Sequence, residues 1–196
     1  MSPDTPQLSQ LPQPSDLSLR PKRLVAELEA QVGNRQAALW CAELLEGADP
    51  HEYESVLWYL GAQATAGVLS GQWDGYWVRT WGARGLRYVW VGGCESAIVA
   101  GLSDEHWRPA EMCLKVAALR DVGEAGPGAV AWTAHELPRV RAAACRTLGA
   151  VGDTEHIAVV EGCLDDPHPE VRRAAARALG AIARRLDVDV DPADYD

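Results

Sequence analysis

Arginine and tryptophan are the side chains in this sequence best suited to binding chemistry, since it has only two lysines and no phenylalanine. Arginine binds carboxylates or phosphates through paired hydrogen bonds, and exposed arginine and tryptophan often dominate protein interfaces. The sequence contains no G-x-S-x-G elbow, no Walker loop and no G-x-G-x-x-G turn before a helix. We therefore expect a binding protein rather than an enzyme, with no catalytic residues.

Repeated segments predict the helices that position these side chains. Residues 108–123, 137–152 and 168–183 align with one another, and residues 49–62 and 75–90 fit more loosely. Each of the first three has a proline near its start, where a helix loses no hydrogen bond. In the second, Val140, Ala143, Ala144 and Leu148 follow the 3.6-residue period of one helix face.

Shorter apolar stripes between these segments predict a second helix in each repeat. The unit is then helix A, a turn with aspartate, helix B and a turn with glycine, with no β-sheet. Since neither helix buries its stripe alone, units must stack. We predict an all-α fold, an α-solenoid formed as a right-handed superhelix of antiparallel helix pairs, with B helices on its concave side. Within 21–186, a cap helix spans 21–32 and five units follow at 34–62, 64–91, 94–121, 126–151 and 154–186.

The pattern P-x-V-R-x-A-A-x-x-x-L-G occurs at 138–149 and 169–180. It resembles HEAT repeats, most closely the short variety named after phycobilisome lyases, and the resemblance covers roughly residues 34–186. It implies an α-solenoid that usually binds proteins. In similar repeats the V-R arginine pairs with an inter-helix aspartate of a neighbouring unit. The resemblance thus implies a structural ladder of Arg79, Arg141 and Arg172, with Asp104, Asp165 and Asp166 as candidate partners.

The outer faces of the B helices predict a partner-binding surface. Residues three and seven apart share a helix face. The alternative for the arginines is that they form a solvated helix face without a partner. The tryptophans crowd at 73, 77, 81 and 90, and the alternative for them is that they form the core of an irregular second repeat (64–91). The predicted partner-binding residues are Trp58, Trp77, Arg84, Arg139, Arg146, Arg173 and Arg177.

The two ends of the chain differ in composition from the repeats. Residues 1–20 contain four prolines among polar residues, which predicts a disordered lead-in. Residues 187–196 contain five aspartates and no basic residue, which predicts an acidic tail. This tail either only solubilises the end of the chain or lies over arginines of the last helix and masks them.

Charge and cysteine usage predict the partner class and the compartment. The net charge is −10, which makes nucleic acid an unlikely partner, and there is no apolar run long enough to span a membrane. Five cysteines without a C-x-x-C pair, and no secretory signal, favour the cytoplasm. We expect a monomer without cofactor or metal. Deoxyhypusine hydroxylase, another HEAT-repeat protein, binds iron through His-Glu pairs, but His51-Glu52 and His135-Glu136 fall at non-equivalent repeat positions.

Three functions follow from these observations. The leading one is a non-enzymatic protein–protein interaction module or scaffold that holds a partner on its concave face, as an adaptor or as an inhibitor of a basic partner. The resemblance to phycobilisome lyases suggests a bilin lyase or isomerase. The HEAT-like alkyl-base DNA glycosylases suggest a third function, in which the arginines and Trp77 line a groove for DNA.

Overall fold

The computed structural model describes residue 8 and residues 11–188, and within them the secondary structure is helical, without a β-strand. This confirms the predicted all-α class, and the helices pack as successive pairs, as in an α-solenoid. The chain divides into two compact units, here called unit 1 (up to residue 112) and unit 2 (from residue 113), with the boundary inside α6 (Trp107–Arg120). None of the helices in the described part combines the length and apolar character needed to cross a bilayer.

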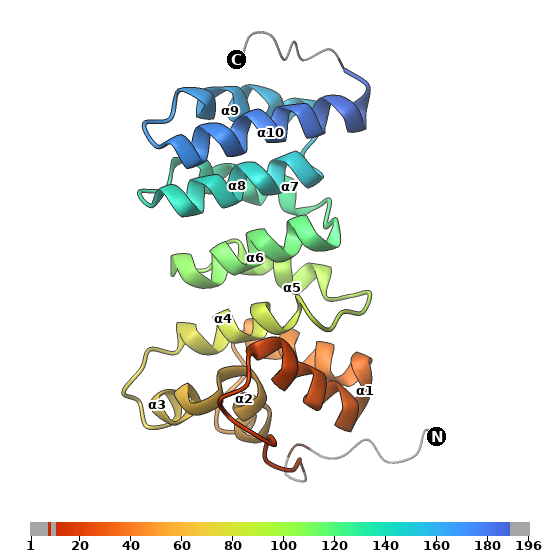
Figure 1. The fold of residues 1–196 in the computed structure, drawn as a ribbon, viewed down its shortest axis with the longest axis vertical. Helices are drawn as coiled ribbons and strands as arrows, with labels where there is room; N and C mark the ends of the chain where they lie inside the picture. The colour runs from red at the N-terminus through yellow and green to blue at the C-terminus, as the bar shows by residue number, and fades with distance from the viewer. Residues whose placement is uncertain (1–7, 9–10, 189–196) are drawn as a thin grey trace. The chain divides into compact units, whose positions relative to one another are not determined.

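In unit 1 the first long helix, α1, contacts α2, α4 and α5 (Figure 1). Helix α4 packs against α1 and α2, and α5 contacts α1. Helix α1 is broken at Gly33, whose φ of 80° and ψ of 158° only glycine adopts readily. Before α6, unit 1 contains α1 (Pro21–Leu45), α2 (Glu54–Gly61), α3 (Thr65–Leu69), α4 (Tyr76–Gly85) and α5 (Glu95–Gly101).

Unit 2 has a more regular arrangement, in which α10 packs along α8, α7 against α8 and α9 against α10 (Figure 1). Short 3-10 turns extend the first helix of each pair. Pro138 and Pro169 occupy the first positions of α8 and α10, where proline costs no hydrogen bond. After α6 the helices are α7 (Ala125–Val130), α8 (Pro138–Val151), α9 (Ile157–Gly162) and α10 (Pro169–Leu186).

Glycine allows a close helix contact in each unit. In unit 1, a Cβ on Gly82 would lie 2.5 Å from the Cys41 carbonyl oxygen of α1. In unit 2, a Cβ on Gly149 would lie 2.7 Å from the Cα of Ala178 in α10. Both distances are shorter than van der Waals contact, so the backbones of α1 and α4, and of α8 and α10, approach closely only because these positions lack side chains.

The prediction of a disordered lead-in is wrong for residues 11–20, which pack against α1 and α2. Pro14 is buried, and the backbone N–H of Ser15 donates to the Glu27 carboxylate at 3.0 Å. The hydroxyl of Tyr59 donates to the Pro12 carbonyl at 2.8 Å. Composition alone suggested disorder because the segment has little apolar surface to bury, yet an extended segment can supply acceptors to buried polar groups. Residues 1–7 and 9–10, and most of the predicted acidic tail (189–196), lie outside the described residues.

Candidate partner-binding surfaces

Four of the predicted partner-binding arginines lie exposed on the two long helices of unit 2. Arg139 and Arg146 belong to α8, and Arg173 and Arg177 belong to α10. Because Gly149 lets these helices pack closely, a side chain of one reaches the other. We call this set of four arginines the arginine face.

One acid, Glu170, lies beside the arginine face. Its carboxylate accepts a hydrogen bond from Arg146 Nη2 at 2.8 Å, and the two side chains are 40% and 50% exposed. This hydrogen bond, with further charge from Arg173, lowers the pKa of Glu170 below its ordinary value. Within the described part of the chain, no hydrogen bond or ion pair engages Arg177. Arg177 is therefore able to form paired hydrogen bonds with a carboxylate or phosphate group of a partner.

Two arginines of the predicted ladder contact an aspartate in the next helix pair. In unit 1, Arg79 donates from Nε and Nη2 to Asp104 at 2.5 and 3.0 Å. In unit 2, Arg141 donates from Nε and Nη2 to Asp166 at 2.6 and 2.8 Å. Arg141 and Asp166 are only 13% and 9% exposed, and their contact raises the pKa of the guanidinium and lowers that of the carboxyl. Such paired, shielded contacts tie consecutive helix pairs together.

Arg172, the third predicted ladder residue, has a different environment. It is exposed, and Nη1 donates to the carbonyl oxygens of Asp166 and Pro167 at 2.8 and 3.1 Å. Arg141 makes the equivalent contacts to the carbonyls of His135 and Glu136. Arg172 therefore keeps the hydrogen bonds to the backbone carbonyls of the turn that precedes α10. Within the described residues it is not bonded to an aspartate side chain.

An Asp-x-His turn, which our reading of the sequence missed, precedes three of the second helices. In each, the histidine N–H donates to the aspartate carboxylate two residues earlier, at 2.8 or 2.9 Å. In the two later turns the histidine Nδ1 also accepts a backbone N–H from two residues ahead. The two later histidines therefore cap helix starts, and the repeated D-x-H spacing was the available sequence signal. The three pairs are Asp49–His51, Asp104–His106 and Asp166–His168.

Arg84 does not have the exposed position that the predicted register gave it. It is half-buried in α4, and Nη2 donates to the carbonyl of Leu60. Burial lowers the pKa of its guanidinium. The prediction that Arg84 faces a partner is therefore corrected: in unit 1 this side chain links α4 to the end of α2.

Trp77 is half-buried, within an aromatic cluster that encloses another arginine. The Arg108 guanidinium carbon lies 4.9 Å from the Trp77 ring centre and 4.5 Å from that of Trp107. Arg108 Nη1 also donates to the Tyr76 hydroxyl at 3.2 Å, while the Tyr76 ring stacks on His106 at 3.6 Å. The cluster is held together by cation–π and stacking contacts, so the π face of Trp77 already has an internal partner.

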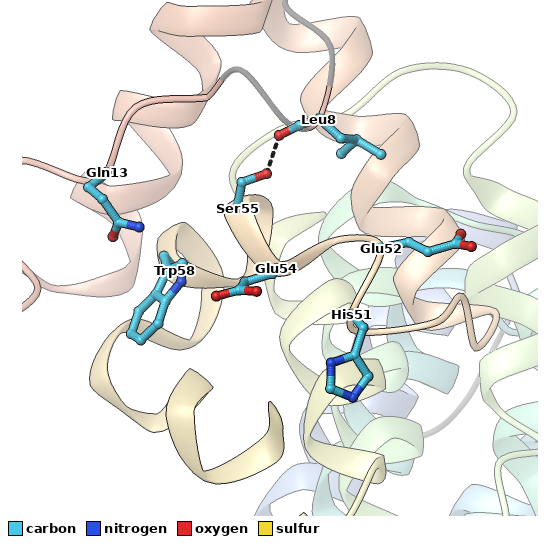
Figure 2. A pocket seen from close by; sticks show the side chains of 7 residues that line it. All are labelled: Leu8, Gln13, His51, Glu52, Glu54, Ser55 and Trp58. Carbon is cyan, nitrogen blue, oxygen red and sulfur yellow. Dashed lines mark hydrogen bonds between the residues drawn. The ribbon is translucent and has the colours of Figure 1, made fainter. Parts of the chain in front are cut away.

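Trp58 lines an open cavity of about 630 Å³ in unit 1. Figure 2 shows Trp58 and Glu54 from α2 on one side and Gln13 of the N-terminal segment on the other. The hydroxyl of Ser55 donates to the Leu8 carbonyl, which ties that segment to α2. The structure thus places Trp58 and Trp77 in unit 1 and the arginine face in unit 2, in separate surroundings.

The titratable side chains of the described residues do not form a metal centre. Nowhere in residue 8 and residues 11–188 do three or more His, Cys, Asp or Glu side chains converge in a way that could hold an ion. All five cysteines lie buried in the described part of the chain and outside any disulfide, and burial raises the pKa of the Cys41 thiol to about 12. A thiol with so high a pKa is a poor nucleophile.

The repeat pattern of unit 2 agrees with a known family. A family model for HEAT repeats matches residues 126–193. The match covers α8, α9 and α10, the helices that carry the arginine face and the Arg141–Asp166 pair. HEAT repeats generally mediate protein–protein interactions. A search of curated proteins finds no match to this chain.

Proposed function

We propose that this chain is a protein-interaction module that binds a partner through the arginine face of unit 2. The observation that carries the proposal is the exposure of four arginines on adjacent HEAT-repeat helices, with one acid beside them. Arginine is one of the residue types that contribute most to interfaces, so exposed arginines gathered on adjacent helices favour a binding surface.

The charge of this surface favours an acidic patch on the partner. The net charge of −10 by itself suggested a basic partner. Arg139, Arg146, Arg173 and Arg177 instead present positive charge within an acidic molecule. Complementary charge speeds association and suppresses wrong partners, so the local surface matters more than the net charge.

The test is affinity capture from the native host with three forms of the full chain. These are the unsubstituted protein, the double variant Arg146→Ala/Arg177→Ala, and the control Arg23→Ala/Arg35→Ala, which removes two exposed arginines of α1. We expect a protein that the unsubstituted form and the control retain and the double variant loses. The captured protein, once purified, should bind with a dissociation constant at least about tenfold weaker for the double variant.

Equal binding of that purified protein to the double variant and the control would refute the arginine-face proposal. Circular dichroism of each variant establishes that helicity is retained. The proposal assigns no role to Trp58 or Trp77, so alanine at either position separates this surface from the cavity and the aromatic cluster of unit 1.

Two functions from the family resemblance stay predictions. A bilin lyase or isomerase would shift the visible absorption of an added bilin. An alkyl-base DNA glycosylase would bind methylated duplex DNA with an affinity that falls steeply with salt. The Trp77 ring that a base would stack on is already covered by Arg108, which argues against the glycosylase.

A further inference from the structure

Helix α10 carries a longer row of basic side chains than the arginine face alone. Arg173, Arg177 and Arg184 are four and eleven residues apart, which places them along one side of the helix. All three are exposed. The rise of an α-helix separates them by about 6 Å and then about 10 Å along its axis. We call this row the arginine stripe.

We propose that residues 189–196 of the same chain bind the arginine stripe and so compete with a partner for the arginine face. This inference rests on the proposed function, because it names an internal competitor for the same surface. Three observations support it without reference to a partner. They are the opposite charges of the segment and the stripe, the backbone conformation at the end of α10, and the length of residues 189–196.

Charge complementarity identifies the segment. Residues 189–196 contain Asp189, Asp191, Asp194 and Asp196 and no basic residue. The stripe contains Arg173, which lies beside Glu170, and Arg177, which within the described residues has no hydrogen-bonded partner. Carboxylates accept paired hydrogen bonds from guanidinium groups, so the segment and the stripe have matching chemistry.

The end of α10 turns the chain away from the helix axis. Asp187 has the left-handed φ of 53° and ψ of 45°, and the N–H of Val188 donates to the Ala183 carbonyl at 3.2 Å. This is the bonding of a left-handed helix end, in which the backbone reverses over the last turn. The turn costs strain at a non-glycine residue, and it sends the chain that follows Val188 away from continuing the helix.

The segment is long enough to cover the stripe. Leu186 and Arg173 are thirteen residues apart, which corresponds to about 20 Å of helix. Eight residues in an extended chain span up to about 26 Å. Asp196 can therefore reach the level of Arg173, the far end of the stripe.

Such a contact is suited to competition rather than permanent closure. Each exposed Arg–Asp pair contributes little by itself and is screened by salt. Attachment to the same chain nevertheless gives the segment a local concentration in the millimolar range. A partner with more carboxylates, or with additional contacts, can therefore displace it.

The test measures binding of a labelled synthetic peptide, DVDVDPADYD, at low salt. The protein forms are the full chain, a chain ending at Val188, and a full chain carrying Asp189→Asn, Asp191→Asn, Asp194→Asn and Asp196→Asn. We expect the peptide to bind the shortened chain and the asparagine variant at least about tenfold more tightly than the full chain, because the internal competitor is then absent.

A second comparison locates the binding surface. In the chain ending at Val188, Arg173→Ala/Arg177→Ala should abolish peptide binding, whereas the matched control Arg23→Ala/Arg35→Ala should retain it. Equal peptide affinity for the full and shortened chains, no binding to the shortened chain, or binding that survives Arg173→Ala/Arg177→Ala would each overturn the inference.

The two proposals fail in different experiments. If the peptide results are as expected but Arg146→Ala/Arg177→Ala loses no captured protein, the tail contact stands and the proposed function fails. If that variant loses its partner but removal of residues 189–196 changes neither peptide nor partner affinity, the proposed function stands and the tail contact fails.

Discussion

Helices α4 and α6 in unit 1 and helix α10 in unit 2 use arginine for opposite purposes. In unit 1, Arg79, Arg84 and Arg108 are held by a carboxylate, a backbone carbonyl and aromatic rings. In unit 2, Arg173 and Arg177 stand exposed on a regular helix. The difference follows from packing. Irregular helices with bulky aromatic side chains need long side chains to bridge their ends, whereas the small residues between α8 and α10 leave no space that an arginine must fill.

Both units nevertheless depend on close backbone contact at one glycine, and this gives the largest expected effect. Gly82→Ala should destabilise unit 1 by about 3 kcal/mol, because the added Cβ meets the backbone of α1 rather than a movable side chain. Chemical unfolding followed by circular dichroism measures the loss.

Gly162→Ala is the matched control in unit 2. A Cβ there meets nothing within 4 Å, so alanine should be neutral or stabilise α9 by up to about 1 kcal/mol. Similar unfolding curves for Gly82→Ala and the unsubstituted chain would show that α1 and α4 can separate without loss.

The shielded pair of unit 2 gives the second effect. Arg141→Met should cost about 3 kcal/mol, because it leaves the carboxylate of Asp166 shielded without its guanidinium. Arg172→Met removes the equivalent residue of the next repeat, which is exposed, and should cost less than about 1 kcal/mol. Equal costs for the two variants would contradict the role of the aspartate contact.

The same pair predicts an acid-dependent loss of stability. Arg141 holds the pKa of Asp166 below its usual value of 3.8. The pair therefore stabilises the fold fully above that value, and its contribution is lost as pH falls through the lower pKa of the folded state. Thermal unfolding of Asp166→Asn should accordingly show a smaller fall in melting temperature between pH 7 and pH 3 than the unsubstituted chain.

The regular part of the molecule was the more predictable one, for a physical reason. Small and apolar residues recur at equivalent positions of segments 137–152 and 168–183, so the sequence pattern alone predicted α8, α10 and their exposed arginines. In unit 1 the positions of Arg84 and Trp77 depend on contacts to Leu60 and Arg108, which are distant in sequence and follow no period. The packing of residues 11–20 was missed for the same reason, since Tyr59 provides the polar group that holds them.

Tyr59 therefore tests the corrected part of unit 1. Its side chain is 1% exposed, and its hydroxyl bonds to the Pro12 carbonyl. Tyr59→Phe should cost about 1 kcal/mol, the net value of one such hydrogen bond, and should increase proteolytic cleavage within residues 11–20. Tyr53→Phe is a control, because that hydroxyl bonds to the exposed Glu43 instead. Unchanged cleavage in Tyr59→Phe would show that other contacts hold the segment.

The smallest expected effect on stability is also the one that separates a binding residue from a structural one. Arg177→Met should change the free energy of unfolding by less than about 0.5 kcal/mol, because an exposed guanidinium stabilises the fold little. Arg84→Met should cost more than about 1 kcal/mol, because the carbonyl of the buried Leu60 loses its charged donor. Partner binding should respond in the opposite order, with a loss for Arg177→Met and retention for Arg84→Met in the folded fraction. If stability and partner binding change together in both variants, Arg177 and Arg84 do not have separate roles. The exposed arginines of α10 would then contribute to the fold as those of α4 do.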